Sequence, residues 1–316
     1  MSSTLTAIRA SFFDFTDVAR QPEEIMAQAR YIDDGVLLLE AGRIVGLHAW
    51  ETLPHAPDDV IDLRGRLIVP GFVDTHIHYP QTEMIGAYGE QLLQWLSHYT
   101  FPVESQYHCA DHAAAMSAFF LQQLLANGTT SALVFGTVHP QSVEALFSAA
   151  DALAMRLIAG KVMMDRHAPE ALLETPEQSY ADTRALIERW HGRGRLSYAL
   201  TPRFAPTSTP ALLEKVRQLR QEYPDVWLHT HLSENPQEVA WVKSLFPQHD
   251  GYLDVYHRYQ LTGRRSLFAH CLHLEDHEWQ CLHDTDSAIA FCPTSNLFLG
   301  SGLFNLKRDR KSTRLN

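Results

Sequence analysis

Seven short apolar segments, separated by polar or amphipathic stretches, constrain the fold of this chain more than any other feature. Helical periodicity marks the stretches at 108–128, 174–192 and 209–224. Strands alternating with helices predict a parallel sheet with right-handed crossovers. No glycine-rich phosphate loop follows the first strand, so we expect a (β/α)₈ barrel, one strand short, rather than an open doubly wound sheet. The predicted strands are 68–78, 129–137, 156–164, 195–203, 226–234, 266–274 and 287–296.

Residues 1–68 have a different pattern, typical of a small β-domain. ASFFDF, GVLLLEAG and RIVGLHAW are short apolar segments, and Ala41-Gly42 is a predicted turn between the last two. These strands are too few for a complete sandwich. We therefore expect an incomplete N-terminal β-sandwich over 1–68 and the barrel over 69–308.

Charge and composition exclude several classes of partner. The net charge is −11, and no run of Lys and Arg occurs before the last ten residues, which disfavours binding to nucleic acid. The four cysteines form no CxxC pair and are expected to be reduced thiols. There is no signal-peptide pattern and no apolar run of about 20 residues. We expect a cytoplasmic protein that acts on a small molecule, with neither nucleic acid nor membrane as a partner.

Two histidine motifs could form a metal site. In VPGFVDTHIHYPQ (69–81), His76 and His78 are two residues apart on a predicted strand and so face one side. In HTHLSEN, His229 and His231 also share a face, and Glu234 follows the strand end. Each motif has a simpler interpretation. Strand-end histidines are often satisfied by backbone or water, and the residues around Glu234 also predict a helix start.

Two further strand ends carry polar side chains. His270 ends the apolar run of AHCLHL, whereas His273, His277 and His283 lie in a polar stretch and are expected on the surface. Arg203 follows Thr-Pro at the end of another strand, where it could hold a planar carbonyl or pair with a carboxylate.

These residues are more informative together than singly. Histidines at the same end of three strands, with a glutamate close to one of them, predict a mononuclear metal hydrolase. Imidazole ligands suit Zn²⁺, which lowers the pKa of a bound water to about 7.

The chain resembles the amidohydrolase superfamily and, within it, the guanine deaminases. PGFVDTHIHYPQ is similar to the first metal motif of the superfamily. LLQWLSHYTFPVE (92–104) and TPRFAPT (201–207) are similar to substrate-binding segments of guanine deaminases. HTHLSEN, AHCLHL and FCPTSNLFLGSG (291–302) follow in the family's order. The resemblance extends from about residue 5 to about residue 308.

The resemblance implies hydrolytic deamination of guanine to xanthine and ammonia, with one Zn²⁺ per subunit (or Fe) and a homodimer for the full-length protein. The HxE…PCxxC signature of the other zinc deaminases is missing. It also implies roles for individual residues: a proton shuttle, a partner for the attacking hydroxide and the oxyanion, metal ligands, and contacts to guanine. By this resemblance Glu234 is the proton shuttle, and His270 contacts the attacking hydroxide and the oxyanion. The metal ligands are His76, His78 and His231. The residues that contact guanine are Gln81, Arg203 and Phe204.

The family pattern also demands an aspartate metal ligand after an eighth strand. The chain instead ends with DRKSTRLN (309–316), which resembles a translated sequencing adapter. We expect that residues 309–316 are not native, and that the 316-residue chain has no useful deaminase activity although its full-length parent does.

Two alternatives remain. A related amidohydrolase could deaminate another heterocycle, such as a pterin, a triazine or cytosine. A non-catalytic relative could keep the fold as a scaffold, although a scaffold has no need of a water-activating set of residues.

Overall fold

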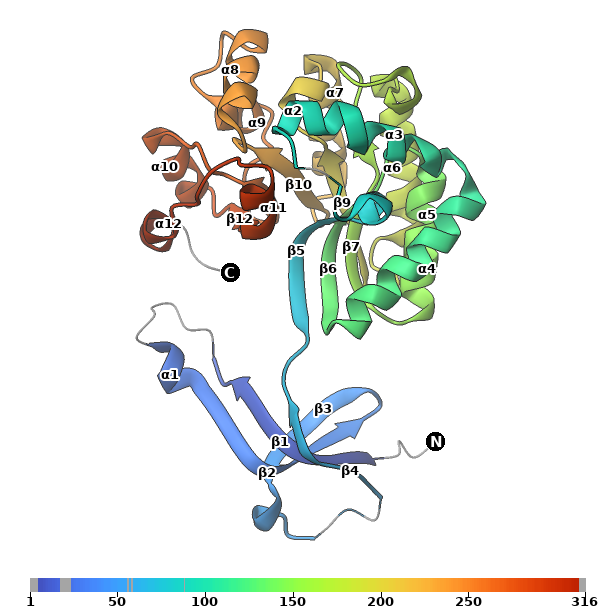
Figure 1. The fold of residues 1–316 in the computed structure, drawn as a ribbon, viewed down its shortest axis with the longest axis vertical. Helices are drawn as coiled ribbons and strands as arrows, with labels where there is room; N and C mark the ends of the chain where they lie inside the picture. Colours follow the sequence, from blue (N-terminus) through green and yellow to red (C-terminus); the bar gives the residue numbers. More distant parts are fainter. Residues whose placement is uncertain (1–4, 18–23, 56, 58, 88, 313–316) are drawn as a thin grey trace. The chain divides into compact units, whose positions relative to one another are not determined.

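The computed structural model describes residues 5–17, 24–55, 57, 59–87 and 89–312, with the side chains described as far as residue 309. The chain divides into two compact units, Met1–Gly71 and Phe72–Asn316, which are shown as ribbons in Figure 1. Each unit is described separately below.

The first unit contains a single four-stranded sheet. Its strands are β1 (Leu5–Phe15), β2 (Ala29–Glu40), β3 (Arg43–Ala49) and β4 (Val60–Ile68), in the order β3-β2-β1-β4. Strand β1 pairs antiparallel with β2 and parallel with β4. The short helices α1 (Ile25–Gln28) and η2 (Trp50–Thr52) complete the unit.

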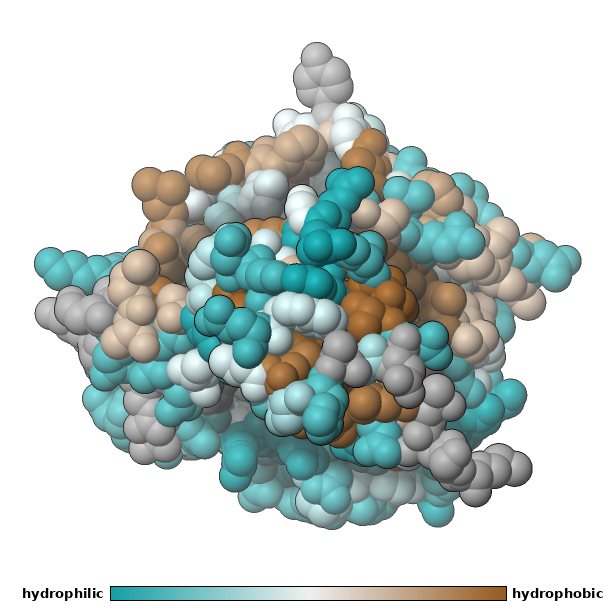
Figure 2. Space-filling view, turned by 90° about the horizontal axis from the view of Figure 1, so that it is seen from below, coloured by the Kyte–Doolittle hydropathy of each residue, from teal (hydrophilic) through white to brown (hydrophobic). Residues whose placement is uncertain are grey.

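The hairpin between β2 and β3 has the turn that the sequence predicts. Ala41 and Gly42 both have positive φ, 49° and 74°, as a two-residue type I′ turn requires. Ala7, Phe12 and Val36 are buried in this unit. Other large apolar side chains, including Ile44 and Ile61, are exposed. The surface view in Figure 2 shows apolar residues interspersed with hydrophilic ones.

The second unit is a nearly closed parallel barrel. Its strand order is β12-β11-β10-β9-β7-β6-β5, and the short β8 also pairs with β9. All seven predicted strands are present, so the predicted fold class is confirmed. The strands are β5 (Phe72–His78), β6 (Thr129–Phe135), β7 (Arg156–Gly160), β8 (Val162–Met163), β9 (Leu196–Pro202), β10 (Trp227–Leu232), β11 (Ser266–His270) and β12 (Ala288–Ala290).

The observed strands are mostly shorter than predicted. The largest difference is at 287–296, where only Ala288–Ala290 form a strand and helix α11 begins at Pro293, a residue that favours a first helical turn. Two further segments also differ. The predicted strand 68–78 begins only at Phe72. Pro70 has no N–H to donate to a neighbouring strand, and it lies in the connection between β4, which ends at Ile68, and β5. The predicted strand 156–164 is interrupted at Lys161. The backbone N–H of Lys161 donates to the side-chain hydroxyl of Tyr198 on β9, at 3.0 Å, rather than to a backbone carbonyl of a neighbouring strand.

Helices follow the strands and cover the outside of the barrel (Figure 1). Five of them begin at proline, whose missing N–H costs nothing in a first turn. Within the residues described, none of the helices is both long and apolar enough to span a bilayer. The helices are α2 (Leu92–Trp95), α3 (Phe101–Glu104), α4 (Ala110–Ala126), α5 (Pro140–Ala152), α6 (Pro176–Trp190), α7 (Pro210–Glu222), α8 (Pro236–Leu245), α9 (Tyr252–Arg258), α10 (Asp276–Asp284), α11 (Pro293–Phe298) and α12 (Leu306–Ser312).

The core lies between these helices and the strands. Side chains such as Phe147 and Val216 pack inward from helices α5 and α7. Gly160 at the end of β7 lets the neighbouring strand approach closely, because a Cβ there would lie 1.8 Å from the carbonyl oxygen of Ala199. Tight packing of this kind holds the strand ends in fixed positions.

Candidate active site

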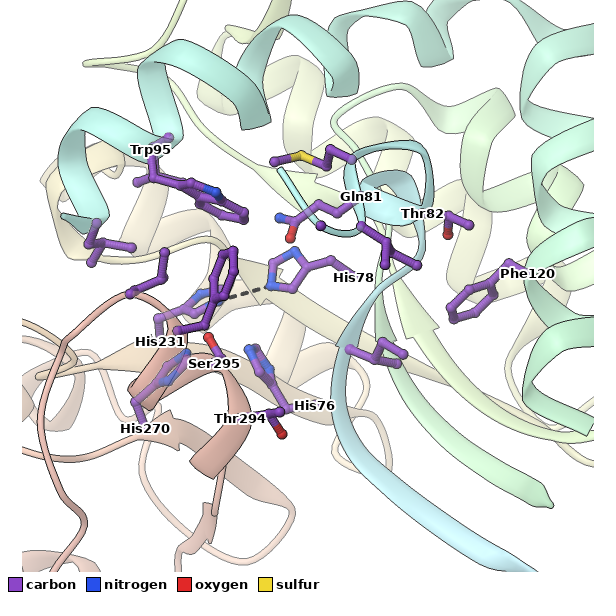
Figure 3. A pocket seen from close by; sticks show the side chains of 18 of the residues that line it. His76, His78, Gln81, Thr82, Trp95, Phe120, His231, His270, Thr294 and Ser295 are labelled. Atoms are coloured by element: carbon purple, nitrogen blue, oxygen red, sulfur yellow. Dashed lines mark hydrogen bonds between the residues drawn. The ribbon is translucent and has the colours of Figure 1, made fainter. Parts of the chain in front are cut away.

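The carboxyl ends of the barrel strands open into a cavity of about 690 Å³. Figure 3 shows imidazoles from β5, β10 and β11 around one part of this cavity. Sequence reasoning placed these side chains together because ends of parallel strands meet at one edge of a barrel. All the predicted site residues line it: His76, His78, Gln81, Arg203, Phe204, His231, Glu234 and His270.

Three imidazoles form a group that could hold a metal. One nitrogen from each of His76, His78 and His231 lies within 4.8 Å of the others. The Nε2 atoms of His78 and His231 are 3.1 Å apart (Figure 3). Phe135 stacks on the ring of His78, with centroids 4.6 Å apart.

His229 belongs to the same cluster. It is fully buried, and its Nε2 lies 2.8 Å from Nδ1 of His76. The sequence pattern left open which histidine of HTHLSEN reaches the metal group. The structure brings the His231 nitrogen into that group and places His229 against His76.

The protonation of these imidazoles suits a cation. Burial, followed by repulsion from the neighbouring histidines, lowers the pKa of His76, His78 and His231 well below the ordinary value. The rings are therefore neutral, which is the form that binds metals. His231 donates from Nδ1 to the Arg203 carbonyl at 2.7 Å, so the lone pair of its Nε2 faces His78.

A second group of donors shares one of these histidines. Nitrogens of His76 and His270 lie within 4.8 Å of the Cys292 sulfur. Within the ranges that the structure describes, neither this group nor the three-histidine group contains a carboxylate. The three-histidine group therefore supplies imidazole ligands and no carboxylate.

Glu234 lies on the turn between β10 and α8. Ser233 has a positive φ of 50°, and Asn235 caps the helix, so the predicted helix start is also present. The Glu238 carboxylate accepts the backbone N–H of Glu234 at 2.8 Å and that of Asn235 at 3.2 Å. Burial raises the pKa of Glu234 to about 8 and that of Glu238 to about 7.

His270 ends β11 and faces Glu234. Its Nε2 lies 3.4 Å from Oε2 of Glu234, and its Nδ1 lies 2.7 Å from Oδ1 of Asn296. Burial lowers the pKa of His270 to about 4, so the ring is neutral. With the amide oxygen of Asn296 as acceptor, Nδ1 carries the proton and Nε2 offers a lone pair.

Arg203 pairs with a residue that sequence reasoning missed. Its Nη1 and Nη2 donate to Oε2 and Oε1 of Glu104, at 2.5 and 3.1 Å, and both side chains are buried. Gln81 donates from Nε2 to Glu104 at 3.3 Å, and Phe101 lies under the guanidinium. Phe204 is buried beside them and contacts Trp241. Glu104 lies within the quoted segment 92–104, but nothing in that segment indicates its partner.

The histidines expected on the surface divide into two kinds. His277 and His283 are about half exposed, as predicted. His273 is instead partly buried, and its Nε2 bonds the Ser301 carbonyl at 2.9 Å, because the segment after α11 returns over it.

Comparison with known proteins places the chain among hydrolases. The model of the amidohydrolase family matches residues 67–312. The guanine deaminase of Escherichia coli K12 is 62% identical over 308 residues, which are 96% of this chain and 70% of that protein. A Deinococcus radiodurans protein described as "Probable guanine deaminase" is 44% identical over 82% of this chain and 59% of its own length.

Solved structures agree in fold. The E. coli guanine deaminase structure superposes with a TM-score of 0.96 and 61% identity, over 97% of this chain and 72% of that one. Atrazine chlorohydrolase from Arthrobacter aurescens, solved with zinc, is 21% identical, with a TM-score of 0.83 over 97% of this chain and 70% of that one, and shares the fold. The chain belongs to the amidohydrolase family.

Proposed function

We propose that the site of this chain serves the hydrolysis of guanine to xanthine and ammonia. The expectation that the 316-residue chain has no useful activity stays a separate prediction, which the turnover assay below tests. The observation that carries the proposal is the meeting of the three-histidine group, Glu234 and Arg203 in one cavity. The similarity of the chain to guanine deaminases supports guanine as the substrate. The matches to triazine-hydrolysing enzymes are too distant to favour the alternative heterocycles.

His76, His78 and His231 would hold the metal. Their neutral rings and convergent nitrogens fit a divalent cation, and three imidazoles favour Zn²⁺, with Fe as the alternative. Such an ion would supply Lewis-acid activation of the attacking water.

Glu234 would move the protons. A carboxyl group whose pKa lies near 8 exchanges its proton readily at neutral pH. It would take a proton from the attacking water and pass it to the purine ring. It would then take the proton of the new hydroxyl group at C2 and deliver it to the leaving amino group. The C2–O bond forms and the C2–N bond breaks, so that water and guanine become xanthine and ammonia.

His270 would orient the attacking oxygen. Because Nδ1 donates to Asn296, the free Nε2 can accept a hydrogen bond from an O–H group. In this tautomer it positions the nucleophile, whereas contact with the oxyanion requires a proton on Nε2.

Arg203, Gln81 and Phe204 would recognise the purine. Arg203 can donate to a ring carbonyl, and Gln81 lies next to it on η3 (Tyr79–Met84). Phe204 lines the same cavity, together with Trp95 and Leu96, which supply apolar surface for a flat ring.

The test is turnover of guanine by the zinc-loaded chain, followed as xanthine and as ammonia in equal amounts, with Glu234→Gln as the inactive control. Binding of guanine to Glu234→Gln is measured in parallel, so that recognition is read without turnover. Turnover or binding of cytosine, a pterin or a triazine in preference to guanine would contradict the proposal. Failure to bind zinc would favour a scaffold.

A further inference from the structure

The ion pair of Arg203 and Glu104 gives the cavity an unusual electrostatic character. Arg203 is 2% exposed and Glu104 is 1% exposed, and two hydrogen bonds join them side by side. A lone buried guanidinium would attract anions strongly. Among the described residues that line the cavity, the only carboxylate or cationic side chains are Arg203 and Glu234. Glu104 therefore cancels the only permanent positive charge at this wall.

The same carboxylate sets the hydrogen-bonding pattern beside Arg203. Glu104 engages one N–H on each Nη atom and leaves the other guanidinium N–H groups to donate elsewhere. It also accepts from Nε2 of Gln81, so the Gln81 carbonyl remains an acceptor. A donor next to an acceptor matches a neutral lactam, whose C=O lies beside an N–H. An ionised lactam has lost that N–H.

We propose that Glu104 determines the specificity of this cavity for neutral over anionic oxopurines. It does so by cancelling the charge of Arg203 and by orienting Gln81 as an acceptor. The inference rests on the proposed function for the choice of a purine as ligand. Glu104 itself does not line the cavity, so it acts through Arg203 and Gln81.

The experiment measures equilibrium binding of two oxopurines to the zinc-loaded chain at one neutral pH. Hypoxanthine is neutral there, and urate is an anion. The readout is the ratio of the urate Kd to the hypoxanthine Kd. Glu104→Gln keeps the shape and removes the charge, so we expect this ratio to fall at least about tenfold. An unchanged or higher ratio would overturn the proposal.

A matched control comes from a second ion pair, between the buried Lys161 and the partly buried Glu174. Lys161 donates to both carboxylate oxygens of Glu174, at 2.5 and 2.6 Å, and neither residue lines the cavity. Glu174→Gln should leave the ratio at the parental value. A fall as large as that in Glu104→Gln would show a general effect of removing a paired carboxylate, which also overturns the proposal.

Arg203→Gln provides an independent test should Glu104→Gln not fold. It leaves the negative charge of Glu104 in place, so urate binding should weaken more than hypoxanthine binding, and the ratio should rise. Equal weakening would contradict the proposal, as would failure of the parent to bind either ligand. Binding of hypoxanthine without any binding of guanine would count against the proposed function and leave the charge inference intact.

Discussion

The Tyr252 hydroxyl donates to Oε1 of Glu238 at 2.7 Å, while the other oxygen of that carboxylate holds the backbone of Glu234. Helix α9 is thus linked through Glu238 to the turn that carries the proposed proton shuttle. All three side chains are buried, so water cannot replace a missing donor.

Replacing Tyr252 with Phe should destabilise the chain by about 1–2 kcal/mol, because the buried Glu238 carboxyl loses its hydroxyl donor. The free energy of urea unfolding measures the effect. Tyr107→Phe is the control, since the buried Tyr107 hydroxyl has no hydrogen-bond partner among the described residues. Equal losses in the two variants would show that the Tyr252 bond contributes nothing specific.

Glu234 and Glu238 should make the metal-free chain less stable as pH rises. Their folded pKa values, about 8 and about 7, lie above the ordinary 4.5. The folded state therefore binds more protons than the unfolded state between these limits. The stability that these groups contribute is present at low pH and is lost as pH rises toward about 8.

The measurement compares the parent with Glu234→Gln/Glu238→Gln in a chelator, from about pH 5 to about pH 8.5. The unfolding free energy of the parent should fall relative to that of the double variant. The comparison cancels the opposite contribution of the buried histidines, whose lowered pKa values destabilise the fold at acid pH. Glu177, which is exposed, gives a control substitution that should leave the pH profile unchanged. Parallel curves for parent and double variant would refute the prediction.

The alternation of apolar and amphipathic segments predicted the fold class. The two-residue period of a strand predicted that the histidines converge. Both patterns can be read from the spacing of residues close together in the sequence. The interruption at Lys161 could not be read from either pattern. The side chain of Lys161 is buried against Glu174, and its backbone bonds the Tyr198 hydroxyl. Both contacts depend on the register between distant segments.

The hydrogen-bond partners of the site residues could not be predicted from the sequence, for the same reason. Glu104 meets Arg203 across 99 residues, and His229 meets His76 across 153. A sequence motif indicates which side chain reaches the cavity, but a partner from another strand or helix is set by packing. Asn296 lies in the quoted segment 291–302, and only the position of α11 shows that it bonds His270.

Asn296→Asp should raise the pKa of His270 above its present value of about 4, because a carboxylate on Nδ1 stabilises the imidazolium. NMR titration of the His270 ring measures it. In Asn296→Leu the acceptor is removed, and the pKa should not rise. A pKa that is the same in the Asp and Leu variants would show that Nδ1 does not face residue 296.

Gly160→Ala should destabilise the chain more than Tyr252→Phe does. The added Cβ would lie 1.8 Å from the Ala199 carbonyl oxygen and 3.1 Å from Oγ1 of Thr201, so β7 and β9 would have to separate. We expect a loss of at least about 3 kcal/mol in the urea unfolding free energy, or no soluble protein. Gly42→Ala is the control. Its Cβ meets nothing within 4 Å, so only the positive φ costs energy, about 1–2 kcal/mol. A Gly160→Ala chain as stable as Gly42→Ala would mean that the strands are not packed this closely.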